Sequence, residues 1–138
     1  MMKLCRVMLP VLLLPLTGAA PSAGAIELQL EGVRSASGRI RIDVYAPPRR
    51  HVLKRIVPAS APGLSLTMPV ERGAYAVMIY HDENGNGKLD KGLLGMPVEG
   101  YAFSNNAKPR LGPPSFEKMR IDVAAGGRTR AAVRMRYP

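Results

Sequence analysis

The sequence has no tryptophan, one cysteine and two histidines among its 138 residues. The cysteine, Cys5, precedes a short apolar run, so the remainder of the chain can form no disulfide and offers no thiolate to zinc. The two histidines, His51 and His81, do not have the spacing of metal ligands, which argues against a zinc or copper site. Stability therefore has to come from burial of apolar side chains.

Long hydrophobic runs are also missing. The apolar stretch 7–16 is too short to span a bilayer, and two prolines interrupt it. A short positive region precedes this stretch and the small residues 23–25 follow it, which is the arrangement of a cleavable signal peptide. We expect residues 1–25 to be such a peptide, cut after Ala25 or alternatively after Ala20, and the product to be periplasmic or secreted.

Acidic residues are scarce. Without residues 1–25, eighteen Lys and Arg stand against ten Asp and Glu, a net charge of +8. Outside the cytoplasm this charge favours contact with anionic lipid or cell-wall polymers and not with nucleic acid. Two interpretations stay open. A basic surface carried by Arg49, Arg50, Lys54 and Arg55 docks peripherally on anionic membrane, or the charge only keeps the domain soluble.

Alternation of apolar and polar residues dominates the chain after residue 25. Such alternation predicts strands with one buried face, over 26–31, 39–44, 64–68, 119–123 and 129–137. Residues 75–80 are apolar on both faces and predict a central, doubly covered strand. No helical period reaches three turns. We predict that residues 26–138 form a single all-β domain, an antiparallel sandwich of about seven strands.

Residues 91–116 form the exception, because they contain four prolines, four glycines and no sustained period. A loop of this length in a compact domain is uncommon and is usually functional. Its large apolar side chains predict an ordered flap that they tuck against the sheet: Leu93, Leu94, Met96, Tyr101, Phe103 and Phe116.

Three separated motifs carry a family resemblance. They are HDENGNGKLD at 81–90, GMPVEGYAFSNNA at 95–107 and GPPSFE at 112–117. Together they resemble the signature of a bacterial exported family, domain of unknown function 2141, over residues 26–137, with Ala102 where the family is expected to carry glycine. The resemblance implies a transthyretin-like or immunoglobulin-like β-sandwich, and it implies no activity.

The first motif spaces oxygen-bearing side chains at every second position. If Asp82 is position one of a calcium loop, Asn84 and Asn86 stand at three and five, the Lys88 carbonyl at seven and Asp90 at nine. These residues are the candidate ligands for Ca²⁺.

The calcium loop is incomplete, and a second interpretation stays open. Position twelve holds Leu93 where a bidentate glutamate would close the shell, so Glu99 or water would have to do so. The expected dissociation constant is about 10⁻⁴ M or weaker. The pairs Asn84-Gly85 and Asn86-Gly87 are also strong hairpin signals, so the same segment is readable as a turn without a metal.

An enzyme is the weaker alternative. His81 and Asp82 could act as base and partner in a hydrolase, but neither Ser104 nor Ser115 has the glycine flanks of a nucleophile elbow. We therefore predict a monomeric, non-enzymatic module with a binding or structural role at the cell envelope. Its working surface would be the first motif together with the flap, and its ligand a protein or an envelope glycan.

Overall fold

The computed structural model describes Gly18 and residues 23–138, so nearly all of the predicted signal peptide lies outside the described residues. The strands are β1 (Gly24–Glu31), β2 (Arg39–Ala46), β3 (Arg50–Pro58), β4 (Gly63–Val70), β5 (Gly73–Asp82), β6 (Gly100–Phe103), β7 (Ile121–Val123) and β8 (Arg128–Arg134). The helical segments are η1 (Leu93–Gly95), η2 (Ser104–Asn106) and α1 (Phe116–Met119). Within Gly18 and residues 23–138, no helix is long and apolar enough to cross a membrane.

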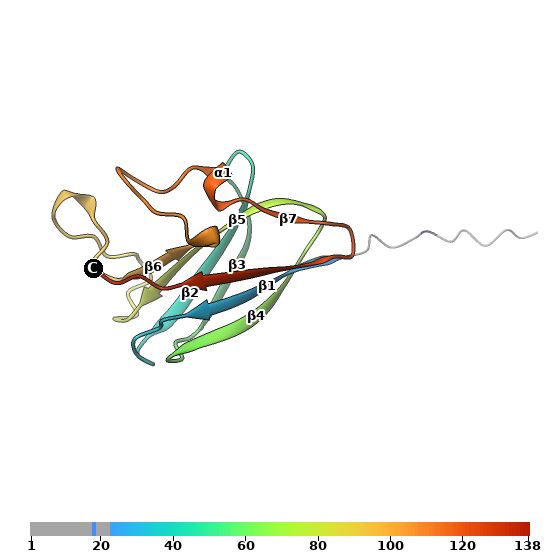
Figure 1. Ribbon diagram of the computed structural model, residues 1–138. Helices are drawn as coiled ribbons and strands as arrows, with labels where there is room; N and C mark the ends of the chain where they lie inside the picture. Colours follow the sequence, from blue (N-terminus) through green and yellow to red (C-terminus); the bar gives the residue numbers. More distant parts are fainter. Residues whose placement is uncertain (1–17, 19–22) are drawn as a thin grey trace, which may run out of the picture.

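The strands form two layers (Figure 1). One sheet has the order β4-β1-β8 and the other β3-β2-β5-β6, with β7 also paired to β5. The predicted all-β sandwich is confirmed, with eight strands in place of about seven. One pair departs from the antiparallel prediction, because β1 runs parallel to β8.

The space between the layers is filled by the alternating apolar residues that the sequence pattern singled out. Their polar neighbours on the same strands face water, as a period of two requires. Full burial of one such aliphatic side chain contributes about 1.5–3 kcal/mol. The central members of this core include Ile26, Leu28, Leu30, Ile40, Ile42, Val44, Val77, Ile79 and Val133.

Strand β5 is covered on both faces, as predicted. Its second face carries Ala76 and Met78, which belong to a separate apolar cluster with Phe103 of the flap and Met119 of α1. The strand lies between β2 and β6 in the sheet. Strand β7 pairs with the first residues of β5, and β6 pairs with its last ones. The Val77 N–H falls between these partners and donates to the Ser104 hydroxyl at 3.0 Å.

Strand β3 was not expected from the sequence, which shows a basic run at this place. It pairs only with β2 and so forms one edge of its sheet. Arg50, Lys54 and Arg55 are exposed on it. Charged side chains on an edge strand hinder pairing with a second chain, which gives the basic run a structural explanation.

Candidate functional site

The first motif begins inside the sheet. Asp82 ends β5 and is fully buried. Its Oδ2 accepts hydrogen bonds from Arg41 Nε at 2.9 Å and from the Gly87 amide at 2.9 Å, and its Oδ1 accepts the Asn86 amide at 3.1 Å. The carboxylate therefore binds β2 and closes the turn that follows β5.

The pKa of Asp82 reflects two opposing effects. Burial alone raises the pKa of this carboxyl, but the Arg41 guanidinium and the two turn amides outweigh it and hold the pKa below its ordinary value. Asp82 is thus a charged structural group at neutral pH.

The rest of the turn is folded around Asp90. The Asn84 Nδ2 donates to the Asp90 carboxylate at 2.6 Å, and the Asn86 Nδ2 donates to it at 2.7 and 2.9 Å. The two asparagine Oδ1 atoms accept the amides of Asn86 and Lys88. These bonds belong to the metal-free turn, the second interpretation of the sequence.

The predicted calcium ligands are therefore neighbours, but they do not all face one point. Within residues 23–138, no three His, Cys, Asp or Glu side chains come close enough to hold a metal by themselves. A cation in this turn would rely on amide and backbone oxygens as well as on carboxylates.

Glu99 lies beside the turn, on the segment that leads into β6. Its Oε2 accepts the Asp90 N–H at 3.1 Å. Its Oε1 is buried and has no hydrogen-bond partner among the described residues. A buried carboxylate oxygen without a partner is rare in folded proteins and calls for an explanation.

His81 has no free ring nitrogen. The side chain is fully buried, with Nε2 2.6 Å from the Ser37 carbonyl and Nδ1 2.8 Å from the Tyr137 hydroxyl. Because a carbonyl can only accept, Nε2 carries the proton and Nδ1 accepts from Tyr137. This arrangement holds two loops together and leaves the imidazole unable to act as a base on an outside molecule.

Of the two candidate nucleophiles, Ser104 is also occupied, whereas Ser115 is exposed and its hydroxyl makes no capping bond. Ser104 is fully buried, accepts the Val77 N–H and donates to the Met119 carbonyl. Ser115 is the residue before α1, and its carbonyl accepts the Lys118 N–H. Neither serine lies against His81 in the hydrogen bonds of the described residues.

The flap is ordered, but only part of it packs as predicted. Phe103, Phe116 and Tyr101 lie in the second apolar cluster. Leu93 and Leu94, in contrast, are 93% and 100% exposed. The expectation that these leucines tuck the loop against the sheet is wrong, because η1 is held by its own backbone bonds and the Lys91–Pro97 bridge.

Met96 follows the leucines of η1, and it is more than half exposed. Its predicted inward packing is therefore wrong as well.

Residues of the segments 91–97 and 109–113 line one hollow. Leu111, on the second segment, is fully exposed too. We call Leu93, Leu94 and Leu111 the leucine tip.

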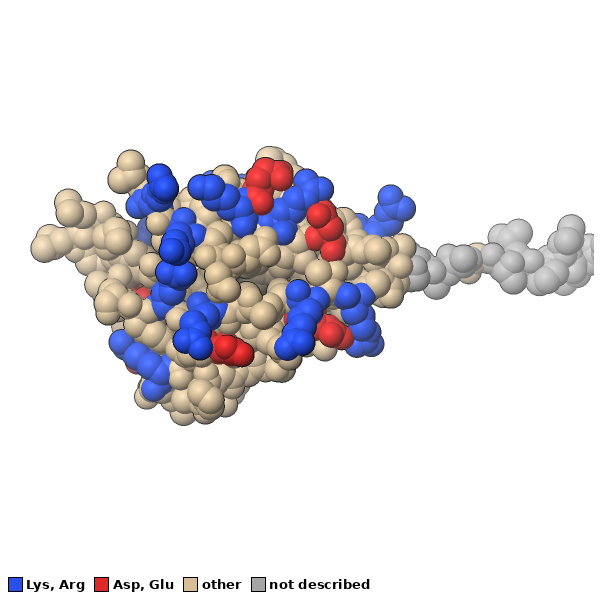
Figure 2. All heavy atoms as spheres, in the orientation of Figure 1, with Lys and Arg blue, Asp and Glu red and all other residues tan. Residues whose placement is uncertain are grey.

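Two cations lie on the segments that carry the leucine tip. Lys91 and Arg110 line the hollow between its two segments, and no acidic residue of the described chain does so. In Figure 2 the end of the molecule that carries the flap is formed by uncharged residues, with Lys and Arg gathered behind it. This end is opposite to the one at which β1 begins (Figure 1).

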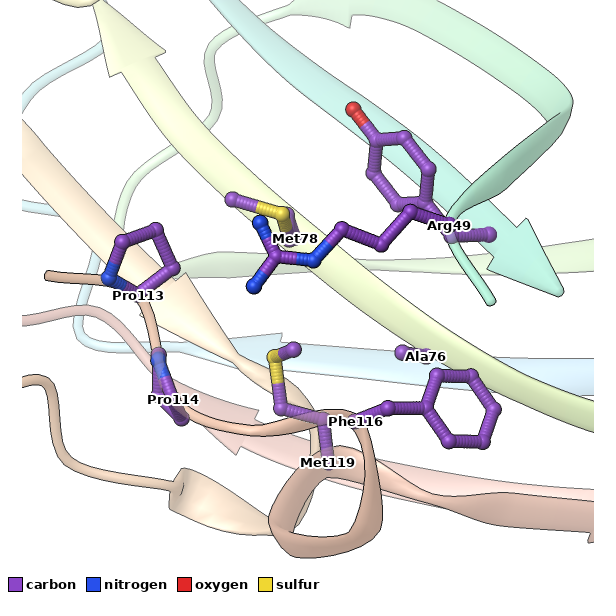
Figure 3. Close-up of a pocket in the computed structure, with 8 residues that line it drawn as sticks. Arg49, Ala76, Met78, Pro113, Pro114, Phe116 and Met119 are labelled. Atoms are coloured by element: carbon purple, nitrogen blue, oxygen red, sulfur yellow. The ribbon is translucent and has the colours of Figure 1, made fainter. Parts of the chain in front are cut away.

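A second hollow lies under the flap, on the other side of Met78 and Pro113 (Figure 3). Its volume is about 220 Å³, and its walls are mostly apolar. In Figure 3 the Arg49 guanidinium extends across it, above Phe116 and Met119. No acidic residue of the described chain lines this cleft. We call it the Arg49 cleft.

Sequence reasoning missed three of these features. Nothing in the first motif signals Arg41, which meets Asp82 only through the β2–β5 register. The role of Arg49 in the cleft depends on how the flap folds over β5. The leucine tip had a detectable signal, since Leu93-Leu94 between two glycines offers no alternation that would bury it.

The remaining basic candidates lie on β3. Arg50, Lys54 and Arg55 belong to the edge strand and not to either hollow. His51 on the same strand bonds Asp43 at 2.9 Å.

Comparison with known proteins gives one match. A family model described as an uncharacterized protein conserved in bacteria (DUF2141) matches residues 28–131. No curated protein and no solved structure matches the chain at a significant level. The matched residues include the first motif, the flap and the central strands of both sheets.

Proposed function

The chain belongs to this family of uncharacterized proteins conserved in bacteria, DUF2141, and from the geometry of its flap we propose that it is an exported, non-enzymatic module that docks on anionic lipid at the cell envelope. The observation that carries the proposal is the leucine tip, three exposed leucines beside Lys91 and Arg110. The lack of a free base at His81 supports a binding role over a hydrolase.

The energetics favour a lipid surface as the partner. Full removal of a leucine side chain from water is worth about 1.5–3 kcal/mol, and each Lys or Arg near an anionic surface adds about 1 kcal/mol. In such docking the leucines would enter the acyl region of the bilayer, and the flanking cations would contact its anionic head groups. Partial insertion of the tip would give reversible, peripheral binding.

The backbone conformation of the leucine tip also supports a binding role. Leu94 has φ +62° and ψ 17°, a left-handed conformation that is costly for a branched apolar residue. Glycine or asparagine would fit the fold better at this place. An exposed leucine in a strained conformation is understandable if its side chain is needed for contact with another surface.

Vesicle sedimentation tests the proposal. Wild-type protein should pellet with vesicles that contain phosphatidylglycerol and should remain in solution with phosphatidylcholine alone. Leu93→Ser combined with Leu94→Asn should reduce binding at least about tenfold, the equivalent of 1.4 kcal/mol. The matched control is Ile56→Ser, an exposed apolar residue on β3. Equal binding by both variants, or no binding by the wild type, would refute docking through the tip.

A second candidate function rests on the Arg49 cleft. Its apolar walls and single cation suit a molecule with an alkyl body and one anionic group. The volume of about 220 Å³ is below the roughly 300–1,000 Å³ of typical small-molecule sites, so one short alkyl chain is the largest body expected to fit.

Calorimetry with decanoate, below its micelle concentration, tests this second candidate. Arg49→Glu should abolish saturable binding, while Arg55→Glu on β3 should leave it unchanged. Decanol should bind more weakly than decanoate, and equally to wild type and Arg49→Glu. If decanoate does not bind the wild type, or if both arginine variants lose binding equally, the cleft is only a packing gap filled by flexible methionines.

A further inference from the structure

Glu99 of the second motif is a buried polar residue beside the first motif, and the hydrogen bonds of the fold use only one of its oxygens. The side chain is only 7% exposed, and it belongs to the flap segment that crosses the end of the Asp82–Asp90 turn. One carboxylate oxygen accepts the Asp90 N–H, and the other has no partner within residues 23–138. A buried carboxylate with an unused oxygen is destabilising unless a donor or a cation reaches it.

The Glu99 carboxylate lies against the turn that holds further oxygen atoms, because its other oxygen accepts the Asp90 N–H. The Asp90 backbone lies at hydrogen-bond distance from Glu99, and the Asp90 carboxylate lies against the side-chain amides of Asn84 and Asn86. Both amides now turn their NH₂ groups toward the Asp90 carboxylate. These partial positive charges stand where a cation would stand, and rotation of the amides would replace them by oxygens.

We propose that Glu99 and Asp90 together bind a calcium ion, with Asn84 and Asn86 as amide ligands and Glu99 in the place of the missing position-twelve glutamate. The observation that carries it is the unpartnered, buried Glu99 oxygen at the end of the turn. The proposal stands apart from lipid docking, which involves neither Glu99 nor Asp90.

Calcium fits this set better than other metals. Its ligands are carboxylate and carbonyl oxygens in a flexible shell of six to eight, and water can fill the positions that the protein leaves open. The described residues here offer no sulfur or free imidazole for a transition metal. Two carboxylates balance the charge of one divalent ion.

In the calcium loop read from the sequence, Asp82 is the ligand at position one. In this proposal it has a different role. Its oxygens are used by Arg41 and by two turn amides, so it shapes the turn and does not ligate the ion. Binding therefore requires movement of the Glu99 and Asp90 side chains and rotation of two exposed amides, which gives up the bonds that their oxygens accept from the Asn86 and Lys88 N–H groups. With two carboxylates, the expected dissociation constant is about 10⁻⁴–10⁻³ M, the range of extracellular modules.

Thermal unfolding of the purified protein with chelator or with calcium over about 10⁻⁵–10⁻² M tests the site. The melting temperature should rise by about 5 °C at tenfold excess over the dissociation constant. Glu99→Gln should abolish the rise. Glu71→Gln, an equal change at the opposite end of β5, should keep it. If Glu99→Gln fails to fold, Asp90→Asn replaces it and should also abolish the rise.

Terbium luminescence locates the ion. The Tyr80 hydroxyl donates to the Gly87 carbonyl at 3.4 Å, so its ring lies beside the turn and can sensitise bound Tb³⁺. The chain has no tryptophan to compete with it. Tyr80→Phe should remove most of the luminescence and keep the calcium-dependent melting shift.

Three results would overturn the proposal. They are a melting temperature that calcium does not change, an equal calcium response in Glu99→Gln and Glu71→Gln, and full Tb³⁺ luminescence in Tyr80→Phe. If Glu99 has only a structural role, Glu99→Gln should change the melting temperature by the same amount with and without calcium. Failure of this test leaves the vesicle experiment unaffected, and the reverse also holds.

Discussion

Replacement of Asp82 by asparagine should cost the fold a large part of its stability. The side chain is fully buried, accepts three hydrogen bonds and pairs with Arg41, whose side chain is only 14% exposed. Asparagine keeps the shape but turns an NH₂ group toward groups that can only donate. It also leaves the Arg41 guanidinium without its counter-charge.

Breaking a buried ion pair from one side costs about 3–5 kcal/mol. For a domain with a total of about 5–15 kcal/mol, that is a large fraction of the free energy of unfolding. The melting temperature should fall by at least about 12 °C. Urea unfolding followed by circular dichroism measures the change. Asp122→Asn, which removes an exposed partner of Arg120, is the control and should cost at most about 1 kcal/mol.

The pH dependence gives an independent check with a defined sign. Because the pKa of Asp82 is lowered in the folded state, the charged carboxyl stabilises the fold above the unfolded pKa of about 3.9. That contribution should disappear as the pH falls through the lower, folded-state pKa. The Asp82→Asn variant should lose less stability over the same acid range. A loss below about 1 kcal/mol at pH 7, or parallel acid profiles for both proteins, would refute the role given to Asp82.

Three further predictions each concern one residue and its local contacts or backbone conformation. Ser104→Ala should cost about 2–3 kcal/mol in urea unfolding, because it leaves the buried Val77 N–H without an acceptor; a cost below that of an exposed Ser→Ala change would contradict it. Gly38→Ala should lower the melting temperature sharply, because Gly38 has φ +70° and a Cβ there would overlap the Asp82 carbonyl; unchanged melting would show that the backbone moves freely there. Leu94→Asn should raise stability by up to about 1 kcal/mol, because asparagine tolerates the left-handed conformation; a clear loss would mean that the leucine packs in the fold.

Period-two patterns predicted most of the fold because one-sided burial forces them. The strands at residues 26–31 and 39–44 and the doubly apolar 75–80 were all found at nearly these positions. Strand β3 escaped prediction because an edge strand with both faces partly exposed has no reason to alternate. The pairing of the first with the last strand depends on tertiary contacts, which local patterns do not encode.

The first motif was found from spacing alone, but its internal bonds were not. Asp90 and the asparagines face one another as the turn signals allow. The capture of Asp82 by Arg41 depends on strand register, and the position of Glu99 depends on how the flap returns to the sheet. Neither is visible in a linear count of ligand positions.

The flap shows where apolar content misleads. Its aromatic residues are buried or partly buried, yet Leu93 and Leu94 of the same segment are exposed. Composition indicates that a segment is ordered, but it does not state which of its side chains make the contacts. In this chain that difference separates a packed loop from a candidate binding surface.

The parallel ladder between β1 and β8 joins the two ends of the domain's chain. Its residues are about a hundred positions apart, as in the Arg128–Glu27 pair. A polypeptide that leaves a ribosome or a translocation pore with its N-terminus first cannot complete this layer until its final segment is released. Such non-local closure slows folding, so this layer can form only after both of these strands have been synthesised.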